Sequence, residues 1–314
     1  MRREVALAAV AISNRLPRAI ARRAGRTIGY LAWLLARDER ERALGRARVA
    51  LGLSDRDARV LVRRCAVAFG GYLADALRLE VWSPAELAAV VRLDGIEHLR
   101  DVLTNGSGAL VLSAHVGNWE LLAAAIGASG VPFAVVGRRP DDPVLARRLA
   151  ALRGRWGVAT IWCDEGPRAI LRALAAGRAV GVLVDQATDA PGGYVPFFGR
   201  PAWTPTGPAR IALRGAVPVL PAHMTDAGEG YVGVIEPPLP VDGGAALAVT
   251  AAWTRHVEGW VRAAPHTWVW MHDRWREVAP RGSGSPGQTG RSRVQRDRAG
   301  STVNRVARRP CRDE

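Results

Sequence analysis

The sequence predicts an α/β fold in which a largely parallel central sheet is flanked by helices and preceded by an N-terminal helical region. From residue 109 onward, short apolar runs that suit buried strands alternate with longer stretches of helical spacing. The first 80 residues have helical spacing but no comparable strand run. Hydrophobic residues make up 48% of the 314-residue chain, which is ample for a core.

Residues 1–37 are predicted to be an amphipathic segment, either lying in a membrane interface or packed on the domain. The apolar runs 5–12 and 28–35 are too short to span a bilayer, which takes about 20 residues. After Asn14, helical spacing places apolar and basic side chains on opposite sides. The apolar side holds Leu16, Ile20, Ala24, Leu31 and Leu35, and the basic side holds Arg18, Arg22 and Arg26. This pattern is typical of a helix in a membrane interface, and a surface helix packed on the domain is the alternative.

The spacing of apolar residues and the positions of Ser, Pro and Gly predict the helices and strands of residues 38–280. A long helix is predicted over 55–79, a second begins at Ser83-Pro84, and a third covers 95–103. Strands are predicted at 109–112, 133–136, 159–162, 180–184, 217–221 and 231–235, and helices at 119–128, 143–155, 167–176, 208–213 and 246–263. Pro221 and Gly228 indicate a hairpin, so one edge of the sheet is expected to be antiparallel.

The central stretch of the chain is 108–120, where a buried strand, a turn and a helix follow one another. Asn118 is a predicted helix N-cap, and Gly130 is the expected stop. His115 therefore lies at the carboxyl end of a strand, the edge where open α/β sheets bind ligands.

The spacing of His115 and Glu120 allows the two side chains to form a catalytic pair. Within one helix, residues five apart lie about 140° apart and do not meet. With His115 in the turn and Glu120 in the first helical turn, the carboxylate could reach back and fix the imidazole tautomer, leaving the other nitrogen free as a base. A structural histidine at a strand end is the alternative reading.

The net charge and the absence of certain motifs limit the classes of partner and cofactor that are expected. The formal net charge is +15, which suits an anionic membrane, an acidic protein or nucleic acid. Without zinc-finger spacing or an RNA-binding aromatic signature, nucleic acid is disfavoured. The sequence has no Walker A, Gly-x-Ser-x-Gly or His-Glu-x-x-His motif, so no nucleotide cofactor and no metal is predicted. The three cysteines are widely spaced and fit a reducing compartment.

Residues 281–314, rich in Gly, Ser, Arg and Pro, are predicted to be a disordered basic tail.

The stretch His-Val-Gly-Asn-Trp-Glu at 115–120 resembles the His-x-x-x-x-Asp/Glu signature of glycerolipid acyltransferases. In its fuller form it is similar to the lipid A biosynthesis lauroyl/myristoyl acyltransferases. Further matches follow in the expected order: Arg138 in Val-Gly-Arg-Arg-Pro, Asp185-Gln186 after an apolar run, the segment 195–209, and the Trp-rich segment 268–276. The resemblance covers about residues 40–276.

This resemblance implies a glycerolipid acyltransferase-like sandwich whose acyltransferase domain spans 38–280. It implies O-acyl transfer from acyl carrier protein or coenzyme A to a lipid A precursor-type glycolipid, at the cytoplasmic face of a bacterial inner membrane. It also favours membrane contact by the amphipathic segment 1–37. His115 would be the general base and Glu120 its orienting carboxylate. The substrate-binding residues would be Asn118, Arg138, Asp185, Gln186, Thr206 and Gly207.

Within this set, Arg138 rather than Arg139 is expected to contact an anion, and Asp185 is expected to order neighbouring donors without touching an imidazole. Alternatives are an acyltransferase for a phosphatidylinositol mannoside or an ornithine lipid, a thioesterase, and a non-catalytic membrane scaffold.

Overall fold

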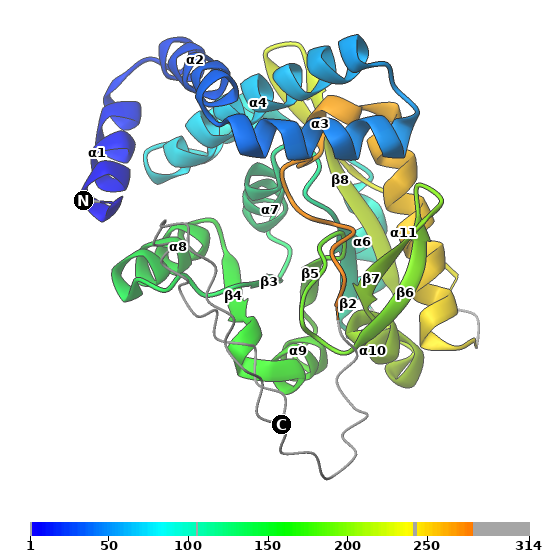
Figure 1. The fold of residues 1–314 in the computed structure, drawn as a ribbon. Helices are drawn as coiled ribbons and strands as arrows, with labels where there is room; N and C mark the ends of the chain where they lie inside the picture. Colours follow the sequence, from blue (N-terminus) through cyan, green and yellow to red (C-terminus); the bar gives the residue numbers. More distant parts are fainter. Residues whose placement is uncertain (1, 105, 241–243, 279–314) are drawn as a thin grey trace, which may run out of the picture.

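In the computed structural model, which describes residues 2–104, 106–240 and 244–278, one mixed sheet runs through the molecule (Figure 1). Its seven strands are in the order β1-β9-β8-β2-β5-β3-β4. Their bounds are β1 (Val91–Asp94), β2 (Ala109–Ser113), β3 (Phe133–Gly137), β4 (Val158–Trp162), β5 (Ala179–Leu183), β8 (Val219–Ala227) and β9 (Gly230–Ile235).

Strands β8, β2, β5, β3 and β4 are parallel, whereas β9 pairs antiparallel with β8 and parallel with β1. The predicted largely parallel sheet with an antiparallel edge is therefore confirmed. The β8–β9 turn contains Gly228 at φ 60°, in agreement with the predicted hairpin.

Eleven α-helices of the described residues surround the sheet. They are α1 (Arg2–Arg15), α2 (Arg18–Leu35), α3 (Arg37–Leu51), α4 (Asp55–Leu77), α5 (Pro84–Val90), α6 (Ile96–Leu103), α7 (Trp119–Ala128), α8 (Pro143–Arg155), α9 (Gly166–Ala175), α10 (Gly207–Gly215) and α11 (Ala246–Ala263). The bounds of α7, α8 and α11 are those that the sequence predicts. The Ser83 side chain and Glu86 form the predicted capping box at the start of α5.

Alternate residues of the central strand β2 belong to two separate cores, as the period of two along a strand requires. Leu110 and Leu112 pack in the core that includes α3, α9, α10 and α11. Ala109 and Val111 pack in the core that includes α5, α6 and α7. The side chains of α4 contribute to both cores, so α4 joins the N-terminal helical layer to the sheet.

Two features differ from the sequence prediction. The strand β1 is not predicted, and the segment 195–209, in which no strand is predicted, contains most of an antiparallel hairpin of β6 (Gly192–Phe197) and β7 (Arg200–Pro205). Pro196, Pro201 and Pro205 argue against a central strand, but an isolated two-stranded ribbon has free edges that tolerate proline.

The N-terminal helices α1, α2 and α3 form a layer over α4 (Figure 1). α2 crosses α4 where Gly25 and Gly29 meet Gly70. The backbones approach so closely there that a Cβ atom on Gly70 would overlap the Gly25 carbonyl oxygen. Among the described residues, no helix combines the length and apolarity needed to cross a bilayer. The predicted tail, 281–314, lies outside the described residues.

Candidate active site

His115 is placed by the turn between β2 and α7. All five residues of β2 are buried, and the strand is followed by Ala114 and then by His115. Gly117 allows the turn to close, because its φ is 63° and a Cβ atom there would overlap the Met224 carbonyl oxygen. The Gly117 amide donates to the Thr267 carbonyl oxygen at 2.9 Å, which fixes the turn against the C-terminal segment.

The imidazole of His115 is paired with Asp185, the second residue after β5. The Nδ1 atom lies 2.8 Å from Asp185 Oδ1, and the His115 backbone amide donates to Oδ2 at 3.0 Å. Ser113 of β2 pairs with Leu183 of β5, so the parallel register brings the two strand ends together. The side chains therefore meet across 70 positions in the chain.

Several donors hold the Asp185 carboxylate in its ionised form. Burial by itself raises its pKa, but the charge of His115 and hydrogen bonds from His115 and Trp268 outweigh burial and lower the pKa to about 2. The Trp268 Nε1–H donates to Oδ2 at 2.8 Å. An ionised carboxylate accepts from Nδ1–H, so the lone pair lies on Nε2, where the Gln186 amide nitrogen is 3.3 Å away. This arrangement allows Nε2 to take a proton.

The predicted pairing of His115 with Glu120 is wrong in this structure. Both oxygens of Glu120 accept from Arg153 of α8: Nη2 lies 2.6 Å from Oε1 and Nε lies 3.1 Å from Oε2. Glu120 is thus bound to a guanidinium, and the carboxylate on the imidazole belongs to Asp185. The expectation that Asp185 has no imidazole nearby is also wrong.

Arg138 and Arg139 follow β3 and differ in their surroundings. Arg138 is exposed and lines a cavity of about 170 Å³ together with His115, Glu120 and Arg153. We call it the His115 cavity. Its guanidinium has no ion pair among the described residues. Arg139 pairs with Asp164 at 2.8 Å, and its guanidinium lies 5.0 Å from the centroid of the Trp162 ring.

Of three further residues predicted to bind substrate, Asn118 lines a second cavity described below, whereas Thr206 and Gly207 line neither cavity. Asn118 is the predicted N-cap of α7, but both ends of its amide are used: Oδ1 accepts from the Leu121 amide at 3.4 Å and Nδ2 donates to the Tyr72 carbonyl at 2.9 Å. Thr206 is buried and precedes α10, which begins at Gly207, and neither residue lines the His115 cavity. The structure does not bring Thr206 and Gly207 to His115.

A second, mostly apolar cavity of about 560 Å³ lies between α2, α3 and α4, and we call it the α2–α4 cavity. It extends to Trp119 and Glu120, which also line the His115 cavity. The Trp119 ring packs edge-on to the His115 ring with 4.8 Å between centroids. Two cavities thus converge beside the imidazole.

The sequence predicts no role in the site for Arg153, and Trp268 enters only as part of the Trp-rich match. The Trp-rich match at 268–276 is the one available signal for Trp268, while one arginine among many gives none for Arg153. In the part of the chain that the structure describes, no three His, Cys, Asp or Glu side chains are grouped as metal ligands would be.

Comparison with known proteins gives matches over most of the chain. The family model for bacterial lipid A biosynthesis acyltransferases matches residues 5–277. A phosphatidylinositol mannoside acyltransferase of Mycolicibacterium smegmatis is 25% identical over 219 residues, covering 68% of this chain and 72% of that protein. One from Mycobacterium tuberculosis is 26% identical, covering 66% and 67%. The lipid A biosynthesis lauroyltransferase of Escherichia coli K12 is 28% identical, covering 62% and 65%.

Proposed function

The chain belongs to the bacterial lipid A biosynthesis acyltransferase family and is a lipid acyltransferase, and from this premise we propose its reaction. It transfers a fatty acyl group from a thioester donor to a hydroxyl group of a lipid A precursor-type glycolipid. The observation that carries the mechanism is the 2.8 Å contact between His115 Nδ1 and Asp185 Oδ1 beside a cavity.

In this mechanism, His115 Nε2 removes the proton from the acceptor hydroxyl as its oxygen attacks the thioester carbonyl. Asp185 holds the Nδ1–H tautomer and stabilises the imidazolium that forms, because its carboxylate is buried and ionised. The proton then passes to the leaving thiolate. Positioned base catalysis contributes about 10²–10⁴-fold, and the thioester is already activated, so no acyl-enzyme is required.

Glu120 supports the site without touching the imidazole. Its ion pair with Arg153 joins the start of α7 to the end of α8, at the rim of the His115 cavity. The first-turn amides of α7 lie at the positive end of the helix dipole and suit the oxyanion of the tetrahedral intermediate. A fixed α7 keeps these donors in register with His115.

The two cavities suit a substrate with long apolar chains and an anionic part. The α2–α4 cavity is large and apolar enough to hold a fatty chain, and it ends at Trp119. Arg138, exposed at the rim of the His115 cavity, suits a phosphate of the acceptor or of the carrier's prosthetic arm. Acyl carrier protein or acyl coenzyme A would supply the thioester, and no other cofactor is proposed.

A second acceptor is supported by the comparisons. Two of the relatives are named phosphatidylinositol mannoside acyltransferases, and their identity to this chain is close to that of the lauroyltransferase. A phosphatidylinositol mannoside, which also offers a hydroxyl beside a phosphate, is therefore the alternative acceptor.

The test is a transfer assay with purified protein. Acyl carrier protein and coenzyme A thioesters would each be paired with a lipid A precursor and with a phosphatidylinositol mannoside, and products identified by mass spectrometry. We expect acylated glycolipid with wild-type protein and none with His115→Ala. Free fatty acid as the sole product would show a thioesterase instead, and equal transfer by His115→Ala would reject the proposed base.

A further inference from the structure

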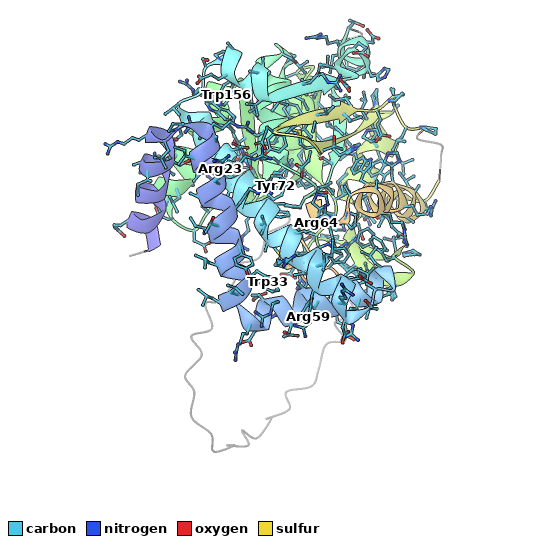
Figure 2. All side chains as sticks on the ribbon, turned by 90° about the horizontal axis from the view of Figure 1, so that it is seen from above. Arg23, Trp33, Arg59, Arg64, Tyr72 and Trp156 are labelled. Carbon is cyan, nitrogen blue, oxygen red and sulfur yellow. The ribbon has the colours of Figure 1, made fainter. Side chains whose placement is uncertain are left out.

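One edge of the His115 ring is closed by a row of aromatic side chains. The Trp119 ring packs edge-on to it with 4.8 Å between centroids. Phe69 of α4 packs on Trp119 at 5.9 Å, and Tyr72, labelled on the same helix in Figure 2, packs edge-on to Phe69 at 5.4 Å. The enclosure is incomplete, because 18% of the His115 side chain is exposed, and water therefore reaches the imidazole.

The nitrogen that takes the proton is covered by a different side chain, that of Gln186. Because Nδ1–H donates to Asp185, the single lone pair of the His115 ring lies on Nε2. The Gln186 amide nitrogen lies 3.3 Å from this atom and is the one hydrogen-bonding partner that the described residues provide for it. An acceptor hydroxyl donates to the same lone pair, so it must displace the amide before His115 acts as a base.

The main chain on both sides of Gln186 is fixed. Asp185 is held by His115, and the Ala187 amide donates to His272 Nε2 at 3.3 Å. Burial lowers the pKa of His272 to about 4, so this nitrogen is free to accept at neutral pH. Arg276 Nη2 donates to the Ala187 carbonyl oxygen, also at 3.3 Å. The Gln186 amide therefore leaves Nε2 by rotation of its side chain, without movement of the loop.

The length of the contact suits a cover that opens. At 3.3 Å it is longer than the usual N–H donor distance of about 2.9–3.0 Å, so it is weak. A bound acceptor displaces the amide at the expense of its own binding energy and loses only apparent affinity. A water molecule has no other contacts that could compensate for the displacement. The contact therefore slows hydrolysis of the donor while no acceptor is bound.

We propose that Gln186 shields the general base from water and so makes the site a transferase and not a thioesterase. The proposal rests on the proposed function of His115. In the reaction that the shield opposes, Nε2 takes a proton from water as the water oxygen attacks the thioester carbonyl. The carbon–sulfur bond then breaks and the proton passes to the thiolate, which leaves a free fatty acid and a thiol.

The first test measures fatty acid released from an acyl thioester without acceptor. Gln186→Ala removes the side chain, and Gln186→Met keeps its length but has no N–H donor. We expect both variants to release fatty acid about fivefold faster than wild type, the factor that one neutral hydrogen bond is worth. The apparent KM for the acceptor should fall by a similar factor, because no amide has to be displaced. Thr188→Ala, in the same loop, is the control and should behave as wild type.

The second test needs no acyl substrate. Diethyl pyrocarbonate modifies the lone pair of a neutral imidazole, and peptide mapping by mass spectrometry gives the rate at each histidine. We expect His115 to react about fivefold faster in Gln186→Ala and Gln186→Met than in wild type. His98 of α6 is the internal standard and should react at the same rate in all three proteins.

The outcomes separate this proposal from the proposed function. Transfer by His115→Ala at the wild-type rate would reject the base itself. If His115→Ala is inactive but Gln186→Ala hydrolyses the thioester and reacts with the reagent as wild type does, only the shield is rejected. Hydrolysis and transfer that fall together in Gln186→Ala would show a structural role and overturn the proposal. A turnover rate lowered by about 10²-fold or more at saturating acceptor would identify the amide as an oxyanion donor and overturn it too.

Discussion

Two buried carboxylates in different regions of the molecule have contrasting partners. Asp185, at the end of β5, contacts the imidazole of His115 and the indole of Trp268. Asp75, on α4 beneath the N-terminal layer, contacts the guanidinium groups of Arg18 and Arg22 and the hydroxyl of Tyr231. An imidazole can exchange a proton near neutral pH, while a guanidinium stays charged. Burial of an acid therefore does not by itself identify catalysis, and the chemistry of its partner separates the two sites.

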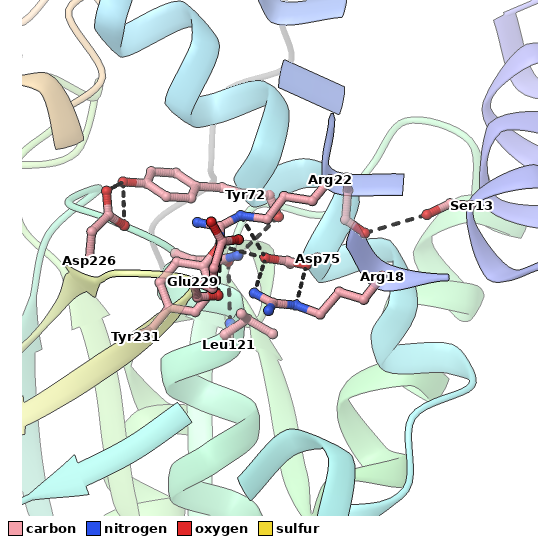
Figure 3. A network of polar contacts seen from close by, with 11 residues as sticks. Ser13, Arg18, Arg22, Tyr72, Asp75, Leu121, Asp226, Glu229 and Tyr231 are labelled. Carbon is pink, nitrogen blue, oxygen red and sulfur yellow. Dashed lines mark hydrogen bonds and ion pairs between the residues drawn. The ribbon is translucent and has the colours of Figure 1, made fainter. Parts of the chain in front are cut away.

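The two regions are nevertheless connected through α7. Tyr72, one turn before Asp75 in α4, accepts at its backbone carbonyl from Asn118, the N-cap of α7. Its hydroxyl donates to Asp226 of β8, and Figure 3 shows this contact beside the Asp75 cluster. Helix α4 thus supports the helix that begins just after the His115 turn. A change at Asp75 on α4 is therefore expected to affect catalysis by displacing α7 and not by removing a group that transfers a proton.

The largest expected effect is on catalysis by Asp185→Asn. The amide has no charge to stabilise an imidazolium and can stabilise the wrong tautomer of His115, so the turnover rate should fall about 10³–10⁴-fold. The measurement is steady-state acyl transfer, with Glu120→Gln as the comparison because Glu120 contacts Arg153. An equal loss of turnover rate in both variants would contradict the assignment of Asp185, and not Glu120, as the carboxylate that supports the imidazole.

The next largest effect is on stability, from Asp75→Asn. The change leaves the buried guanidinium of Arg22 with less compensating charge, and the free energy of unfolding should fall by about 3 kcal/mol. Urea denaturation measures it, and Asp55→Asn, which removes an exposed partner of Arg48, is the control with an effect below about 1 kcal/mol. A turnover rate lowered as far as in Asp185→Asn would contradict the proposed division of roles.

A smaller effect is expected from Arg138→Ala. A charge-assisted contact with a substrate anion is worth roughly 1.5–3 kcal/mol, so kcat/KM should fall about ten- to two-hundred-fold. Arg138→Lys should recover part of the loss, since a point charge replaces a planar fork incompletely. Arg139→Ala is the neighbouring control because Arg139 pairs with Asp164. If the control loses as much activity, Arg138 has no special role.

The smallest expected effect is on the pH dependence of the free energy of unfolding. The pKa of Asp185 is lowered from 3.8 to about 2, so its ionised form contributes stability above about pH 4. This contribution is lost as the pH falls from about 4 to about 2. The free energy of unfolding of wild type should therefore decline more steeply over this range than that of Asp185→Asn. Parallel curves would show that the native carboxyl is not held ionised.

The sequence by itself determined the local frame of the site. The apolar run before His115, the cap at Asn118 and the helix after it depend on neighbours within a few residues, and the structure has them as predicted. The parallel sheet follows from the same local alternation of strands and helices. The hairpin β6–β7 does not follow from local rules, because its prolines are unfavourable in a strand and are tolerated only where the ribbon has free edges.

Only the tertiary structure decided which groups meet. Asp185 reaches His115 because β5 pairs with β2, whereas Glu120 turns to Arg153, which lies 33 positions away on another helix. Arg18 and Arg22 turn inward because Asp75, far along the chain, is buried beneath them. Spacing along one element limits the directions that a side chain can take. The choice among those directions follows from a partner's charge and burial, and packing supplies both from distant parts of the chain.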